Sequence, residues 1–155
     1  MAAYYLDTSA LVKCYAQEQG TIWMTALVAP QAGHDLYTVR LTGPELVAAL
    51  ARKARTGAVT PADAARATLL FRYDWLQRQY RIIEVAVAVA DRAMSLVERH
   101  GMRGYDAVHL ATTLEAQDVR QTLRLSAIIF VSADDEQRHA ATAEGLMVEN
   151  PNAYP

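Results

Sequence analysis

The sequence has one cysteine, no long apolar run and almost no net charge. Because Cys14 is alone, a disulfide within the chain and a zinc site built on several cysteines are both excluded, and a reducing compartment is favoured. The apolar run from 85 to 90 is closed by Glu84 and Asp91, far short of the roughly 20 apolar residues that span a membrane. No basic segment precedes Asp7, so no signal peptide is predicted. We therefore expect a cytoplasmic protein with no membrane partner.

The composition predicts one compact domain. The chain has 155 residues, of which 52% are apolar and 21% are charged, as in ordinary globular proteins. The net charge of −2 lacks the basic excess of many nucleic-acid binders. The charge is unevenly spread, however, because residues 40–81 contain eight Lys or Arg and only three Asp or Glu. This basic region fits either a nucleic-acid enzyme or a solvated helix surface.

Short β-rich segments alternate with helical ones along the whole chain, a pattern typical of an α/β fold with a mainly parallel sheet. We expect one three-layer α/β/α domain over residues 1–150 and a short tail over 151–155. Thr8 or Ser9 is predicted to cap the first helix. The predicted strands are 4–6, 35–39, 81–85, 127–131 and 146–148, and the predicted helices are 10–14, 22–29, 45–55, 61–79, 87–100, 106–116 and a last one that ends near 143.

Four acidic residues stand at element ends. Asp7 and Asp134 follow predicted strands, where ligands of parallel sheets bind, whereas Glu45 and Asp106 begin predicted helices. Each helix position also has a structural explanation, because a helix N-terminus stabilises a carboxylate by ~0.3–1 kcal/mol. Carboxylates that converge repel one another unless a cation joins them. Mg²⁺ or Mn²⁺ suits an all-oxygen set, and such ions activate water for attack at phosphorus.

Four segments carry a resemblance to a known family. They are YLDTSALVK at 5–13, LTGPELVAAL at 41–50, RGYDAVHLA at 103–111 and VSAD at 131–134. In this order and at these separations they resemble the motifs of PIN-domain nucleases, and most closely those of VapC-type toxins from bacterial toxin–antitoxin pairs. The resemblance extends over almost the whole chain and implies a PIN-like fold.

The resemblance implies a metal-dependent endoribonuclease that cleaves RNA and is blocked by a VapB-type antitoxin. It also implies that the enzyme forms a homodimer, as is common in the family. It implies that Asp7, Glu45 and Asp106 hold the catalytic Mg²⁺ or Mn²⁺ and that Asp134 completes the acidic pocket. Asp135 directly follows Asp134 and is the alternative candidate for the fourth acid, because a shift of the motif by one residue would select it. Thr8 and Ser132 match hydroxyl positions that steady such a site.

Other polar residues have two interpretations each. His109 lies three residues after Asp106, on the same helix face. It is interpreted either as a proton shuttle or as a buried, hydrogen-bonded histidine. Lys13 is either a phosphate contact or a helix-surface lysine. Three further basic residues are candidates for contacts with the RNA backbone, namely Arg52, Lys53 and Arg55.

Rival functions make different demands on the sequence. A phosphatase with an aspartyl nucleophile needs a second carboxylate two residues after it, where this chain has Ser9. A receiver-like phosphoacceptor domain needs an acidic pair before the first strand's aspartate and a lysine after the last core strand, and neither is present. A housekeeping PIN nuclease, or a silent domain that only binds RNA or a partner, stays open.

Overall fold

The computed structural model of the protein describes residues 1–77 and 79–155. Its strands are β1 (Ala3–Leu6), β2 (Asp35–Val39), β3 (Arg81–Ile83), β4 (Ile128–Val131) and β5 (Met147–Glu149). Its α-helices are α1 (Thr8–Leu11), α2 (Thr21–Val28), α3 (Thr42–Arg55), α4 (Pro61–Leu76), α5 (Val87–His100), α6 (Gly104–Thr122) and α7 (Asp135–Ala143). Short 3₁₀ turns cover Val12–Cys14, Pro30–Ala32 and Pro151–Ala153.

The strands form one sheet in the order β3-β2-β1-β4-β5, and every pairing is parallel. The chain builds outward from β1 to β3 and then returns to place β4 on the other side of β1. This reversal makes the β1–β4 boundary the topological switch point, where parallel sheets form ligand sites at their carboxyl edge. Leu6 pairs with Val131, so the residues that follow these two strands emerge next to each other.

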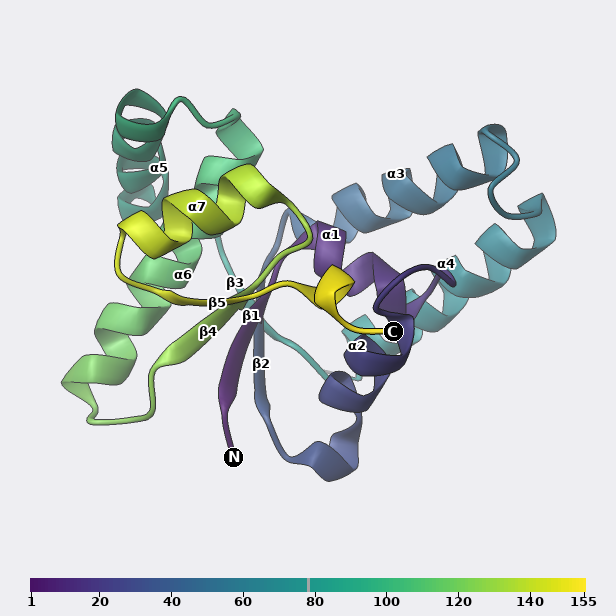
Figure 1. Ribbon diagram of the computed structural model, residues 1–155, viewed down its shortest axis with the longest axis horizontal. Helices are drawn as coiled ribbons and strands as arrows, with labels where there is room; N and C mark the ends of the chain where they lie inside the picture. The colour runs from purple at the N-terminus through teal and green to yellow at the C-terminus, as the bar shows by residue number, and fades with distance from the viewer. Residues whose placement is uncertain (78) are drawn as a thin grey trace.

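Helices cover both faces of the sheet, which confirms the predicted three-layer α/β/α architecture (Figure 1). One core lies between the sheet and α5, α6 and α7, with Tyr5 and Phe130 fully buried in it. The other core lies against α1 to α4 and contains Leu6 and Val131. Successive β1 residues thus enter opposite cores, as the two-residue period of a strand requires. Figure 1 also shows α3 and α4 extending as a pair beyond the sheet.

Most predicted elements are present, with some shifts in their ends. Helix α6 continues six residues beyond the predicted end at 116, to Thr122. Helix α3 starts at Thr42, before the predicted start, and α4 ends at Leu76. The predicted continuation of α4 to residue 79 includes Arg78, which lies outside the described residues. The predicted cap of α1 was wrong, because the Asp7 side chain, and neither Thr8 nor Ser9, accepts the capping bond from Ala10 N.

Within residues 1–77 and 79–155, no helix combines the length and apolar character needed to cross a bilayer. The tail residues lie against the rest of the domain, since Pro151 is buried and the Tyr154 ring stacks on Trp23 at 4.5 Å between ring centroids.

Candidate active site

Asp7 lies at the centre of the carboxyl edge of the sheet. Its side chain is 1% exposed, and its backbone N–H donates to Val131 O at 3.2 Å, which continues the β1–β4 pairing by one step. Its Oδ1 accepts from Ala10 N at 2.9 Å and from Ser9 Oγ at 2.8 Å. Its Oδ2 accepts from Ser132 Oγ at 2.8 Å. The cap of α1 and the end of β4 therefore fix both carboxylate oxygens.

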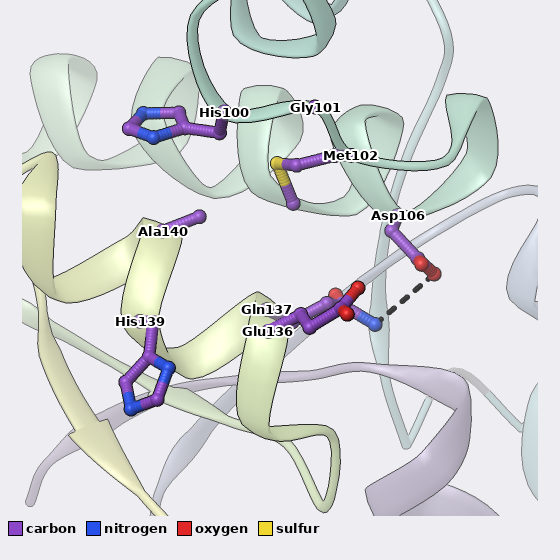
Figure 2. A pocket seen from close by; sticks show the side chains of 8 residues that line it. All are labelled: His100, Gly101, Met102, Asp106, Glu136, Gln137, His139 and Ala140. Atoms are coloured by element: carbon purple, nitrogen blue, oxygen red, sulfur yellow. Dashed lines mark hydrogen bonds between the residues drawn. The ribbon is translucent and has the colours of Figure 1, made fainter.

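Asp106 approaches Asp7 from the first turn of α6, and one glutamine joins them. Gln137 Nε2 donates to Asp7 Oδ2 at 3.0 Å and to Asp106 Oδ1 at 3.2 Å. Figure 2 shows the second of these bonds, with Gln137 reaching from α7 towards Asp106. Because one nitrogen contacts an oxygen of each acid, the two carboxylates lie within reach of a common cation.

Glu45 is held by a network that starts in the core. Helix α3 is tied to the end of β1, because Thr38 Oγ1 donates to Leu6 O at 2.9 Å and lies 2.7 Å from Thr42 Oγ1. Glu45 Oε1 accepts from Thr8 Oγ1 at 3.1 Å and from His109 Nε2 at 2.7 Å.

His109 itself is 1% exposed. Its Nδ1 lies 2.9 Å from the Tyr5 hydroxyl, which donates to it when the imidazole is neutral. His109 is thus a buried, hydrogen-bonded residue that also contacts the candidate site, through Glu45.

Asp134 and Asp135 occupy different environments. Asp134 caps α7, with Oδ1 accepting from Gln137 N at 2.9 Å, and it lines the same cavity as Asp7 and Asp106. The Asp135 side chain is 79% exposed and pairs with Arg138. Ser132 Oγ accepts from Asp134 N at 3.0 Å while donating to Asp7. This geometry favours Asp134 as the fourth acid.

The four acids surround a cavity of about 540 Å³ with a basic rim. Lys13, Arg52, Lys53 and Arg103 line it. Lys13 is buried and is no helix-surface lysine, contrary to one of its two interpretations. Both lysines contact Glu18, with Nζ–Oε distances of 3.2 Å for Lys13 and 2.7 Å for Lys53.

Arg55 lies elsewhere, in a shallow groove between α3 and α4. Arg52 and Lys53 thus flank the acids, and Arg55 does not.

The electrostatics of the site oppose full ionisation. Burial raises the pKa of Asp7, although the nearby His109 and the hydrogen bonds from Ser132, Ala10 and Ser9 act in the opposite direction. Burial and the neighbouring Asp134 raise the pKa of Asp106. A cation between these carboxylates would remove the repulsion that their proximity creates.

The residues present fit a hard divalent ion. All candidate ligands are carboxylates, and the shared contact to Gln137 places two of them close together. Within the described ranges, 1–77 and 79–155, no group of three His, Cys, Asp or Glu gathers tightly enough to hold an ion unaided. Mg²⁺ meets that situation in proteins by binding one or two carboxylates and keeping several waters. The arrangement suits Mg²⁺ or the similar Mn²⁺.

Gln137 is a site residue that sequence reasoning missed. It stands three residues after the capping Asp134, at a position where a glutamine ordinarily turns back to the cap's own N–H. Here Ser132 Oγ already accepts from that N–H, so the amide is free to reach Asp7 and Asp106. The capping pattern was a signal of its position but not of its contacts.

Known proteins resemble the chain in sequence and in fold. The sequence model of the PIN domain matches residues 4–143. Ribonuclease VapC45 of Mycobacterium tuberculosis is 36% identical over 119 residues, which are 76% of this chain and 79% of that protein.

Solved structures share the fold. PAE2754 from Pyrobaculum aerophilum has a TM-score of 0.61 at 20% identity and covers 95% of this chain and 83% of its own. A toxin–antitoxin complex from Klebsiella pneumoniae has a TM-score of 0.58 at 16% identity, with 96% and 97% covered. The chain belongs to the PIN domain family.

Proposed function

We propose that the protein is a metal-dependent endoribonuclease that hydrolyses RNA phosphodiester bonds at the cavity around Asp7. One observation carries the proposal: Asp7 Oδ2 and Asp106 Oδ1 lie 3.0 and 3.2 Å from a single atom at the switch point of the sheet. Two further acids and a basic rim surround that point. The 36% identity to ribonuclease VapC45 supports RNA as the substrate.

Each residue has a definite task in this proposal. A bound Mg²⁺ or Mn²⁺ would supply an activated water and neutralise charge on the phosphate. Asp7 and Asp106 hold that ion, and Ser9 and Ser132 fix the Asp7 carboxylate. Asp134 adds a further negative group at the edge of the cavity.

Glu45, which lines the same cavity, joins Asp7 and Asp106 in the proposed metal-binding set. Thr8 and His109 hold it there through hydrogen bonds to Oε1. Two cationic side chains on the rim, Arg52 and Lys53, are the proposed contacts for RNA phosphates near the cleaved bond. Lys13 and Arg55 are weaker candidates, because Lys13 is buried and Arg55 lies outside the cavity.

We further propose that the enzyme is a toxin acting in the cytoplasm and neutralised by a VapB-type antitoxin. The support is the 36% sequence identity between this chain and a VapC ribonuclease. Exposed apolar side chains on α4, including Leu69, Tyr73 and Leu76, offer surface that a protein partner would cover. The homodimer stays a prediction, which the mass of the purified protein in solution tests.

The phosphatase and the silent binding domain fit the geometry less well. Ser9 occupies the position where a phosphatase needs an acid, and its hydroxyl donates to both oxygens of Asp7, leaving that carboxylate poorly placed as a nucleophile. A housekeeping nuclease would use the same site without an antitoxin. A silent binding domain would have no need of Asp106 beside a buried Asp7.

The direct test is cleavage of a structured RNA by the purified protein with Mg²⁺ or Mn²⁺ and with EDTA. We expect cleavage that EDTA abolishes and that Asp106→Asn reduces by about 100-fold or more, since even partner residues around metal ligands cost 10–100-fold. Asp91→Asn, at an exposed position on α5, is the matched control. Undiminished cleavage in EDTA contradicts the proposal.

Toxicity is tested separately. Expression without a partner should arrest growth, and Asp106→Asn should relieve the arrest. If the wild-type protein is harmless in cells while the purified protein cuts RNA, the toxin assignment fails and the housekeeping nuclease remains.

A further inference from the structure

Gln137 is a buried amide with only half of its hydrogen bonds made. The residue is 5% exposed. Its Nε2 donates to Asp7 and Asp106, whereas its Oε1 is buried and, among the residues that the structure describes, has no hydrogen-bond partner. Buried carbonyl oxygens are nearly always paired, so the unpaired Oε1 is exceptional. The side-chain hydrogen bonds that orient this amide are the two that Nε2 donates to the carboxylates.

Nε2 contacts one oxygen of each carboxylate, as a cation shared by the two acids would. It places the positive end of an amide dipole between two carboxylates that otherwise repel each other. A bound cation and these two N–H groups would compete for the same oxygen atoms. In that competition the amide would stabilise the pair of carboxylates without a metal and would have to move when one binds.

The structure also offers a place for the amide to move to. A second cavity of about 340 Å³ lies against the candidate active site, with Asp106 and Gln137 lining both. Figure 2 shows this cavity, with Gln137 beside Asp106 and with His100 and Met102 further along its wall. Its volume exceeds that of an amide group, and its polar lining can hold water. Hydration there would satisfy the Oε1 that is unpaired now.

We infer that Gln137 is a displaceable stand-in for the metal, which holds Asp7 and Asp106 together in the metal-free protein and swings into the second cavity when a divalent ion binds. The inference rests on the proposed metal site. Its consequence is that Gln137 lowers the affinity for Mg²⁺ and so sets the ion concentration at which the site fills.

The test is calorimetric titration of the metal-free protein with Mg²⁺ alone. Gln137→Met keeps length and volume but removes both polar atoms. We expect it to bind Mg²⁺ about tenfold more tightly than the wild-type protein, a size typical of residues that surround metal ligands. We also expect its melting temperature to fall in EDTA and to recover with Mg²⁺. Gln121→Met, at an exposed position on α6, is the matched control.

Weaker or unchanged binding by Gln137→Met overturns the inference, since it would mean that the amide supports the bound metal or is indifferent to it. If the wild-type protein binds no Mg²⁺ at all, the proposed metal site itself fails.

A measurement on the wild-type protein decides the matter if Gln137→Met does not fold. The side-chain amide signals of Gln137 in ¹⁵N-labelled protein should be slow to exchange with water in EDTA. On saturation with Mg²⁺ they should shift and exchange quickly. Signals that stay unchanged at saturation overturn the inference.

Discussion

Asp7→Asn separates the chemistry of the site from its architecture better than any other single change. Asparagine has nearly the volume of aspartate and caps helices equally well, so its Oδ1 can keep the bond from Ala10 N that aspartate makes at 2.9 Å. An asparagine side chain nevertheless offers one acceptor oxygen where the buried carboxylate offers two. The substitution therefore removes a proposed metal ligand and leaves the start of α1 in place.

The stability change has two sources, the hydrogen bonds that Asp7 Oδ2 accepts and the charge that the carboxylate carries. The new amide cannot accept from Ser132 and Gln137, whose donors now lie 2.8 and 3.0 Å from Asp7 Oδ2. Ser132 can rotate its hydroxyl to accept instead, and Gln137 keeps its bond to Asp106. Each hydrogen bond that is broken costs about 1 kcal/mol. Burial raises the pKa of the Asp7 carboxyl group, which means that its charged form is disfavoured in the fold. Removing that charge therefore offsets part of the cost.

We expect the melting temperature in EDTA to change by only a few degrees, since about 1 kcal/mol corresponds to roughly 2–4 °C in a domain of this size. We expect RNA cleavage with Mg²⁺ or Mn²⁺ to fall by about 100-fold or more. Asp7→Ala makes the useful contrast, because it also removes the helix cap, worth about 1 kcal/mol. Full activity in a folded Asp7→Asn protein would refute the assignment of Asp7 as a metal ligand.

Three further predictions test neighbouring parts of the site. His109→Phe removes the bond to Glu45 and leaves the Tyr5 hydroxyl without that partner, so cleavage should fall about 10–100-fold and unfolding free energy by about 1–3 kcal/mol. The fold raises the pKa of Asp106, so protonated Asp106 stabilises the folded protein. In EDTA this stabilisation is complete below the unfolded-state pKa of about 3.9 and is lost as the pH rises through the folded-state pKa. Between these two pKa values, the melting temperature of the wild-type protein relative to Asp106→Asn should fall with rising pH. Lys53→Gln should weaken RNA binding at low salt and reduce the salt slope by about one, and an unchanged slope would remove Lys53 from the RNA surface.

The strands and their order of appearance were predictable because they are short, apolar and bounded by polar residues. The segment 127–131 is such a case, and the structure has β4 at Ile128–Val131. The helix 87–100 was predicted to the residue, since Gly101 with its φ of 66° ends it. Helix α6 ran past its predicted end because no glycine or proline interrupts 106–122, and Leu114 and Arg120 in its later turns are buried.

The acids themselves could be selected from sequence, but their support could not. Asp7 and Ser132 are 125 positions apart, and their hydrogen bond exists only because Leu6 pairs with Val131. Glu45 on α3 and His109 on α6 are 64 positions apart and meet through a hydrogen bond. No local periodicity encodes such contacts, which depend on strand register and on which helices flank the switch point.

The error in the α1 cap has the same origin and is informative about the site. Asp, Ser and Thr are all common helix caps, but Ser9 Oγ is already engaged with the Asp7 carboxylate and Ala133 N. It donates to the first and accepts from the second. Asp7 takes the cap because its carboxylate is already fixed by β4 through Ser132. The residue that begins α1 is therefore the residue that anchors the candidate metal site. A substitution that disturbs the strand register should consequently move the helix and the site together, because a single carboxylate holds both.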